Sequence, residues 1–194
     1  MARRDRTGTI KFLTQDELKR LLTAIKKHGS KRDFAIFLVA YRHGLRAAEV
    51  GELQKSDLDW SKLRLMLHRN KGSYSGEHPM QPDEVKALRS YLRSRTDDSP
   101  ILFASLRRVP VGRVQLHRLM KKYGALADLP ADKQHFHVLK HSIATHLLDA
   151  SDDIRFVQDW LGHSNIQNTV IYAQLVSSSR ESKARKHFMK LPKF

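Results

Sequence analysis

The sequence has no cysteine, and this absence excludes disulfide bonds, thiolate zinc sites and cysteine nucleophiles together. It also has no apolar run of about 18 residues, as a membrane-spanning helix needs, and no lipidation signal at either end. The N-terminus, MARRDRTGTIKF, lacks the apolar core of a secretion signal. We therefore expect a cytoplasmic protein with no membrane partner, in which any covalent chemistry uses a residue other than cysteine.

Acidic residues are scarce, because 20 Asp and Glu stand against 36 Lys and Arg, which gives a formal net charge of +16 at pH 7. The basic excess is spread along the chain, and such a charge indicates a polyanionic partner, namely nucleic acid. Binding should weaken by roughly 0.9 log unit per log unit of salt for each phosphate contacted. A basic protein without such a partner, and one that binds a membrane surface, are the alternatives.

The chain is long enough for one substantial core, with 194 residues and 40% hydrophobic content. It has no internal repeat, low-complexity block or evident linker. We expect a mainly α-helical domain with a small antiparallel β-sheet or hairpin, an α+β fold, over residues 13–176. Residues 1–12, with Arg3, Arg4 and Arg6, form a basic arm, and residues 177–194 form a basic C-terminal helix.

Apolar periodicity and end signals predict the helices. Thr14 and Glu17 have the spacing of a capping box, and Gly44 and Gly162 suit the position just past a helix end. Pro82 is suited to a first helical turn. The predicted helices start at residue 14 and end near 29, and then run over 33–43, from 82 to about 95, and over 112–127, 137–149 and 153–161.

The region between residues 60 and 80 predicts a sheet. Leu63, Leu65 and Leu67 recur at every second position, so we expect them to form the buried face of a strand. Asn70-Lys71-Gly72 then makes a turn, and residues 74–80 return as the second strand. Lys71 therefore lies at a hairpin tip, where a lysine is either simply solvated or free to reach a DNA groove and donate a proton.

Arg46, in GLRAAEV, lies at the beginning of a helix, where the macrodipole disfavours a cation. Such a local conflict indicates function, and Glu49, one turn later, can hold the guanidinium. A surface arginine in an ordinary ion pair explains the position equally well.

His137, Lys140 and His141, in HVLKH, share one face of a helix. Two histidines four residues apart also suit a metal, but no cysteine is available, and the third ligand would have to be Asp149, His135 or His163. We therefore expect no metal and no other cofactor. A purely structural histidine face is the remaining alternative.

His163 follows the helix stop at Gly162, and Ser164 and Gln167 have the spacing of a second capping box. The loop should therefore fix the His163 side chain, although a hydrogen-bonded loop histidine without function fits as well. Tyr172, in VIYAQ, has Ile171 and Leu175 beside it, so by itself it fits a partly buried core tyrosine with an exposed hydroxyl.

Taken together, GLRAAEV, the hairpin Lys71, HVLKH, LGHSN and VIYAQ resemble the ordered active-site motifs of the tyrosine recombinase (phage integrase) family. The resemblance covers about residues 14–190. The stretch AYRHGLRAAEVGEL with DLDW, and the short length, resemble the small fimbrial phase-variation (Fim-type) recombinases in particular.

The resemblance implies a mechanism for DNA inversion, excision or integration without metal or ATP. Tyr172 would attack the scissile phosphate and form a 3′-phosphotyrosyl link, releasing a 5′-hydroxyl. Arg46 would bind the nonbridging oxygens, His163 would hydrogen-bond the phosphate, and His137 would act as general acid/base near the tyrosine. Lys71 would protonate the leaving 5′-oxygen, and Glu49 and His141 would support these residues.

Two departures from the family pattern matter. Lys140 stands where the family usually has an arginine, so the bidentate phosphate contact is lost and activity is weakened or absent. We also expect that the N-terminal DNA-binding domain usual in the family is lacking, and that the basic arm substitutes for it in part.

Further expectations concern the assembly. Ala184, Phe188 and Leu191 form an apolar stripe that either packs on its own domain or docks on a neighbouring protomer. The resemblance implies double-stranded DNA as partner, a homotetramer on paired sites that is a monomer when free, accessory DNA-bending proteins, and association with the nucleoid.

Two other functions compete with a recombinase. The first is a catalytically weakened or inactive DNA-binding regulator of recombination sites, which Lys140 would explain. The second is a type IB topoisomerase-like enzyme that relaxes DNA with the same chemistry but without paired sites.

Overall fold

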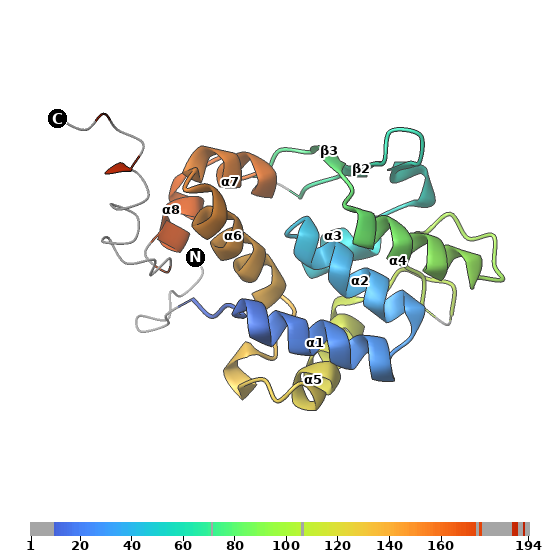
Figure 1. Ribbon diagram of the computed structural model, residues 1–194. Coiled ribbons are helices and arrows are strands. Elements are labelled where there is room, and N and C mark those ends of the chain that lie inside the picture. Colours follow the sequence, from blue (N-terminus) through green and yellow to red (C-terminus); the bar gives the residue numbers. More distant parts are fainter. Residues whose placement is uncertain are drawn as a thin grey trace.

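The fold is mainly helical, with one small antiparallel sheet, as the sequence predicts. The computed structural model describes residues 10–70, 72–105, 107–173, 175, 188, 189 and 192 (Figure 1). Most of the predicted arm at 1–12 and of the C-terminal helix at 177–194 therefore lies outside the described residues.

The described chain begins with two helices whose ends follow local sequence signals. Helix α1 spans Gln15–His28 and is capped by the predicted box, in which Glu17 N donates to Thr14 Oγ1 at 3.2 Å and Thr14 N donates to Glu17 Oε2 at 2.7 Å. Helix α2 spans Lys31–Arg42. It is followed by Gly44 at φ +60°, a left-handed conformation that favours glycine.

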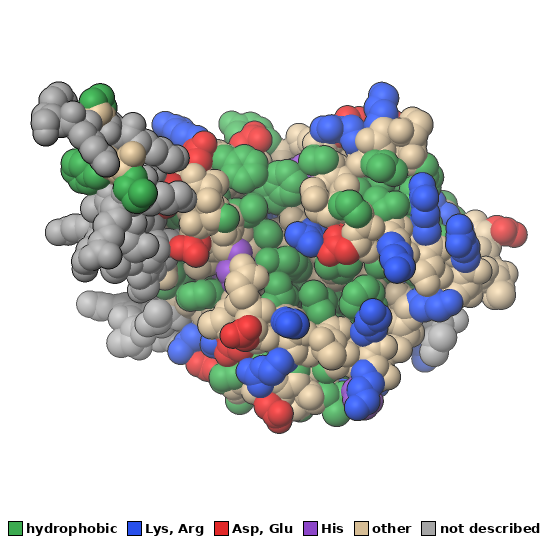
Figure 2. Space-filling view, viewed as in Figure 1, with side chains coloured by type: hydrophobic (Ala, Val, Ile, Leu, Met, Phe, Trp, Pro, Cys, Tyr) green, Lys and Arg blue, Asp and Glu red, His purple; other side chains and the backbone are tan. Residues whose placement is uncertain are grey.

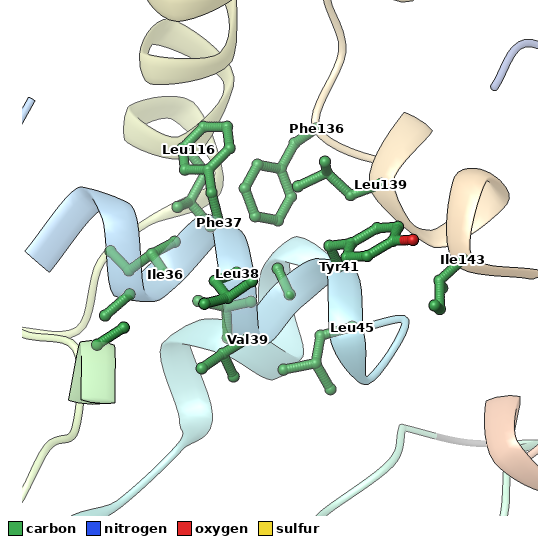
Figure 3. Close-up of a cluster of buried hydrophobic side chains, with 14 of the residues drawn as sticks. Ile36, Phe37, Leu38, Val39, Tyr41, Leu45, Leu116, Phe136, Leu139 and Ile143 are labelled. Atoms are coloured by element: carbon green, nitrogen blue, oxygen red, sulfur yellow. The ribbon is translucent and has the colours of Figure 1, made fainter. Parts of the chain in front are cut away.

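The core surrounds α2 (Figure 3). Phe37 is fully buried and meets the rings of Tyr123 and Phe136 edge-on, at centroid distances of 5.9 and 5.5 Å. Tyr123 comes from α5 (Arg113–Leu126), and Leu139 and Ile143 approach from α6 (Val138–Ser151). Truncating a ring in such a position to alanine costs about 3–5 kcal/mol, so α2 and its neighbours form a rigid base for the loops that leave them.

The sheet has three strands in the order β1-β2-β3. Strand β1 is Leu58–Asp59, β2 is Arg64–Leu67 and β3 is Gly76–Pro79, with Leu65 opposite His78. Leu65 and Leu67 are buried as predicted, but Leu63 is 40% exposed and precedes the strand.

The error at Leu63 has a local cause, because the side chain of Asp59 closes a tight turn. Its Oδ1 accepts hydrogen bonds from Ser61 N and Lys62 N, both at 2.9 Å. Leu63 follows at φ +52°, a turn conformation, so the buried face of the strand begins at Leu65 rather than at Leu63. The same turn folds β1 back onto β2, a pairing that the sequence had not indicated.

The remaining elements complete the domain. They are α3 (Ala47–Glu52), α4 (Pro82–Arg93), α7 (Ile154–Leu161), α8 (Gln167–Ala173) and the short 3-10 turns Lys55–Asp57 and Ala131–Lys133. Pro82 opens α4 as predicted. Helices α6, α7 and α8 pack together at one end of the molecule (Figure 1). None of the helices in the described part of the chain is long and apolar enough to span a membrane.

The loop between α7 and α8 differs in one respect from its prediction. Gly162 ends α7 at φ +66° as predicted, but Ser164 does not cap α8, since its hydroxyl donates to the distant Gly72 carbonyl at 2.7 Å. The side chain of Asn165 instead accepts a hydrogen bond from the backbone N–H at the start of α8, from Gln167 N to Asn165 Oδ1 at 2.9 Å. The loop is therefore tied to the hairpin that follows β2.

Candidate active site

A group of charged side chains, here called the cation cluster, gathers where α3, α6 and the loops after β2 and α7 meet. Its members are Arg46, Glu49, Arg69, Lys140 and His163. Arg46, Arg69 and Glu49 all act on the pKa of Lys140 and on that of His163, so segments distant in the sequence share one electrostatic environment.

Arg46 occupies the N-cap of α3 and is held by Glu49, as the sequence predicts. Arg46 Nη1 lies 2.7 Å from Glu49 Oε1, and the Arg46 backbone N–H donates to Glu49 Oε2 at 2.8 Å. The Arg46 side chain remains 35% exposed, and its Nη1 also donates to Ser73 Oγ at 3.3 Å. Glu49 and Ser73 therefore hold the guanidinium in place, and its exposed part remains open to an anion.

Glu49 is nearly fully buried, at 2% exposure. Burial alone would raise the pKa of its carboxyl, but the Arg46 backbone N–H and the charge of Arg69 outweigh burial and hold that pKa below its ordinary value. Glu49 therefore stays ionised near neutral pH and joins two arginines.

Arg69 is a member of the cluster that the sequence analysis missed. Its side chain is 1% exposed and donates from Nη1 to Glu49 Oε2 at 3.1 Å and to the Gly44 carbonyl at 3.2 Å. Its Nη2 donates to the carbonyls of His43 and Trp160 at 2.8 and 3.2 Å. Arg69 thus joins the ends of α2 and α7 to the carboxylate that holds Arg46.

A signal for Arg69 was present in the sequence. Leu65 and Leu67 mark the inward face of β2, and the two-residue period of a strand places Arg69 on that same face. A charged residue on the buried face of a strand needs a buried partner, which here is Glu49.

Lys140 is 2% exposed, in the first turn of α6. Burial, followed by repulsion from Arg69 and Arg46, lowers its pKa to about 7, although Glu49 opposes the shift. Its Nζ is 3.5 Å from the Leu161 carbonyl. The ammonium is therefore only partly protonated at neutral pH, and an approaching anion would favour the protonated form.

His163 is held on both sides, as expected of a loop between two helices. Its Nδ1 shares a hydrogen bond of 3.0 Å with Thr169 Oγ1, and its carbonyl accepts from Gln158 Nε2 at 2.9 Å. Burial and the charges of Lys140 and Arg46 lower the His163 pKa to about 4. The ring is therefore neutral at pH 7.

Lys71 lies outside the described residues, but its neighbours show where the hairpin runs. Tyr74 N donates to the Gly162 carbonyl at 2.8 Å, and Ser73 forms an isolated antiparallel bridge with His163. A Cβ on Gly162 would come within 2.5 Å of the Tyr74 carbonyl oxygen, so the close approach requires glycine. The hairpin therefore runs along the rim of the cation cluster.

His137 and His141 form a second part of the site, near Tyr172. Their rings pack edge-on with centroids 4.4 Å apart. Nδ1 of His141 and the Tyr172 hydroxyl share a hydrogen bond of 3.0 Å. His141, for which the family resemblance implies a supporting role, is thus the histidine hydrogen-bonded to the tyrosine.

The pKa values of both histidines are lowered, which keeps the rings in the neutral form that can accept a proton while making them weaker bases. Burial, then repulsion from His137, lowers the pKa of His141 to about 3. Loss of solvation and the charges of Lys140 and Arg46 lower that of His137 to about 4, although the residue keeps an exposed edge. Both rings are neutral at pH 7.

Tyr172 is covered in this arrangement, with 2% of the residue exposed. Burial raises the pKa of its phenol to about 12, while Arg46 acts in the opposite direction. The sequence-based alternative of a core tyrosine with an exposed hydroxyl does not describe it, because the hydroxyl points to His141 rather than to open solvent. Its electrostatic coupling to Arg46 places it beside the cation cluster.

Two chemical properties follow from this geometry. Arg46 and the partly protonated Lys140 present positive charge around one buried carboxylate, which suits a phosphate. A tyrosine hydroxyl and two neutral histidines lie next to that charge. Within the described ranges, no three His, Asp or Glu side chains form a metal-binding group.

Comparison with known proteins agrees with these features. The model of the phage integrase family matches residues 11–178. Tyrosine recombinase XerA of Thermococcus onnurineus (strain NA1) is 36% identical over 168 residues, which make up 85% of this chain and 58% of XerA. The type 1 fimbriae regulatory protein FimB of Escherichia coli (strain K12) is 35% identical over 167 residues, 83% of this chain and 82% of FimB.

The fold agrees as well. The crystal structure of XerA recombinase gives a TM-score of 0.76 at 30% sequence identity, covering 100% of this chain and 68% of that one. The predicted fold class and the resemblance to Fim-type proteins are both confirmed. The chain nevertheless spans little more than half the length of the XerA sequence it matches.

Proposed function

This chain belongs to the phage integrase family, and we propose that it is a site-specific recombinase that cuts and rejoins DNA through a covalent bond to Tyr172. The observation that carries the proposal is the contact between Tyr172 and His141 beside the cation cluster. The net charge of +16 and the partly exposed Arg46 suit double-stranded DNA as the substrate.

The reaction exchanges one phosphodiester for another. The Tyr172 oxygen attacks the scissile phosphorus, the bond to the 5′-oxygen breaks, and that oxygen leaves as a 5′-hydroxyl after taking up a proton. The 3′-phosphotyrosyl bond retains the energy of the broken one, so a 5′-hydroxyl from a second strand can reverse the step without ATP.

Proton transfer from Tyr172 needs a base, because its phenol has a pKa of about 12. His141 is neutral and already hydrogen-bonded to the hydroxyl, so we assign it the first acceptance of the proton. His137, in ring contact with His141, is the general acid/base that the family resemblance indicates. Lys71 is assigned, by resemblance, the proton donated to the 5′-oxygen.

The phosphate is stabilised by the cation cluster. Arg46 contacts the nonbridging oxygens, and Glu49 fixes its orientation. His163 donates a hydrogen bond from the ring nitrogen that Thr169 leaves free. Lys140 supplies a positive charge that the phosphate itself stabilises, since a nearby anion favours the protonated ammonium.

Cleavage also requires the phenol to be uncovered. Tyr172 is 2% exposed near the end of α8, and α8 packs on α6 and α7. We propose that α8 shifts on this support when DNA binds, carrying the hydroxyl toward the cation cluster. The barrier to this shift then adds to the barrier of the chemical step.

The family resemblance supports a proposal for the wider assembly. We propose a catalytic domain over residues 13–176, a DNA-contacting arm at 1–12, and a C-terminal segment at 177–194 that docks on a neighbouring protomer. The active form is a homotetramer on paired sites, with a monomer when free and accessory DNA-bending proteins. Action on chromosomal DNA places the protein at the nucleoid in the cytoplasm.

A nicked suicide substrate tests the proposal. Duplexes tiled across the DNA that flanks the gene carry a nick beside each candidate cleavage point, so that a short product diffuses away and the covalent adduct accumulates. Wild-type protein should form an adduct that survives denaturing electrophoresis, and Tyr172→Phe should form none.

Tyr91→Phe is the matched control, because Tyr91 is also buried, at 5% exposure, and lies outside the site. This variant should form the adduct at the wild-type rate. An adduct that persists in Tyr172→Phe would exclude Tyr172 as the nucleophile.

A further inference from the structure

Tyr74 presents an exposed aromatic ring at the rim of the cation cluster. The residue is 70% exposed, and among the described residues no other ring or cation packs against it in an aromatic or cation–π contact. We propose that Tyr74 is a stacking platform for a nucleobase next to the cleaved phosphate, an inference that rests on the proposed function.

The backbone of Tyr74 is fixed on both sides. Its N–H donates to the Gly162 carbonyl at 2.8 Å, and Ser164 Oγ donates to the Gly72 carbonyl at 2.7 Å. On the other side, Arg69 N donates to Ser75 Oγ at 2.9 Å. The ring is therefore carried by a held backbone, so little backbone entropy is lost when a flat partner packs on it.

The neighbouring residue connects this ring to the phosphate ligands. Ser73 Oγ accepts from Arg46 Nη1 at 3.3 Å, and Ser73 bridges to His163. A nucleobase is separated from its own phosphate by one sugar. A phosphate bound by Arg46 therefore brings a base of the same strand into the neighbourhood of residue 74.

The chemistry of the ring favours a base as its occupant. An aromatic face stacks on any nucleobase, and such contacts can be lost by alanine substitution with a several-fold to hundredfold decrease in affinity. The surrounding guanidiniums and ammonium attract the strand that carries the base. An apolar protein surface would have to bury these cations, which disfavours it as the occupant.

Other exposed apolar side chains differ from Tyr74. Phe156, at 38% exposure, packs on Trp160 with centroids 5.9 Å apart. Val114, at 65% exposure on α5, belongs to a helix that carries no residue of the cation cluster. Single exposed apolar residues are common, so position and fixed backbone, rather than exposure alone, distinguish Tyr74.

The test measures stacking directly. Suicide duplexes carry the fluorescent base 2-aminopurine at each position flanking the cleavage point in turn, and the proteins compared are wild type, Tyr74→Ala, Tyr74→Phe and the control Val114→Ala. Wild type should quench one position on binding. Tyr74→Ala should lose that quenching and bind about tenfold more weakly, whereas Tyr74→Phe and Val114→Ala should match wild type.

Two outcomes would overturn the inference. One is unchanged quenching and affinity in Tyr74→Ala, and the other is a loss in Tyr74→Phe equal to that in Tyr74→Ala, which would assign the effect to the hydroxyl. Melting temperatures equal to that of the wild type would show that the exposed substitutions leave the fold intact.

The same duplexes separate this inference from the proposed function. A covalent adduct formed by Tyr74→Ala with unchanged quenching refutes the platform and leaves the recombinase standing. Quenching that depends on Tyr74, without any adduct from the wild type, shows that Tyr74 stacks on a base of bound DNA and refutes the recombinase.

Discussion

Two neighbouring groups of buried polar side chains differ in how their charges are balanced. One is the cation cluster. The other, the histidine–glutamate cluster, consists of His43, His78 and Glu84. His43 Nε2 is 2.5 Å from Glu84 Oε1, and the two Nδ1 atoms of His43 and His78 are 3.3 Å apart. Arg69, a member of the cation cluster, contacts the second group by donating a hydrogen bond to the His43 carbonyl.

In the histidine–glutamate cluster, the polar groups are matched to one another. His43 and Glu84 are fully buried, and the His78 ring packs on Trp160 with centroids 4.3 Å apart. Such pairing gives the buried polar groups hydrogen-bond partners, which is what a stable interior requires.

In the cation cluster, positive charge remains. Arg46 and Arg69 share the single carboxylate of Glu49, and Lys140 adds a third cation whose pKa is lowered to about 7. Like charges held together in a partly desolvated site destabilise the folded protein until an anion arrives. The contrast indicates that one cluster serves the fold and the other serves a ligand.

The largest effect is expected for Arg46→Ala, which removes the exposed cation of the cluster. The rate of adduct formation in single-turnover assays should fall by roughly 10²–10³-fold, as for the loss of a main transition-state contact. Arg42→Ala, which breaks a surface ion pair with Asp83, should change that rate less than about twofold. A decrease of less than about threefold for Arg46→Ala would refute the assignment.

Glu49→Gln should come next, because it leaves the buried Arg69 without its anion. The free energy of unfolding, from urea denaturation, should fall by about 3 kcal/mol. Glu77→Gln breaks the exposed pair with Arg64 and should cost less than about 1 kcal/mol. Equal decreases in the free energy of unfolding for Glu49→Gln and Glu77→Gln would contradict the conclusion that Glu49 balances the charge of a buried arginine.

Lys140 predicts a pH dependence of DNA binding. Its pKa is about 7 in the free protein, and a bound phosphate raises it, so binding takes up a proton above pH 7. Affinity at constant ionic strength should therefore fall by up to about tenfold per pH unit from pH 7 to 9. Lys140→Arg should flatten this slope.

Lys133→Arg is the control, because Lys133 pairs with Glu17 and lies outside the cation cluster. Its DNA affinity should depend on pH as that of the wild type does. Anisotropy titrations at fixed salt measure all three proteins. A slope that survives in Lys140→Arg would assign the proton to another group.

The smallest effect is expected in the histidine–glutamate cluster. Glu84→Gln should lower the free energy of unfolding by about 1–2 kcal/mol, because a buried hydrogen bond is weakened rather than lost. The adduct-formation rate of the folded variant should stay within about twofold of wild type. A loss comparable to that of Arg46→Ala would show that this cluster, too, takes part in catalysis.

The sequence predicted what depends on neighbouring residues. The Thr14–Glu17 box, the left-handed Gly44 and Gly162, and the Pro82 helix start all act within one turn, and all are confirmed. The Ser164 cap failed for the opposite reason, since its hydroxyl found an acceptor 92 residues away at Gly72.

The site was predicted less completely. Ordered motifs named Arg46, Lys140, His163 and Tyr172, but pattern alone could not show that Arg69 completes the ion pair of Glu49. Nor could it show that Tyr172 is covered and bound to His141, because that contact depends on how α8 packs on α6.

The central claim is that Tyr172 forms the bond to DNA even though Tyr74 is the more accessible phenol at the site. Tandem mass spectrometry of the trapped adduct after proteolysis tests this directly. We predict a nucleotide attached to the peptide around Tyr172 and an unmodified peptide around Tyr74. A nucleotide on Tyr74, or on any residue other than Tyr172, would contradict the account.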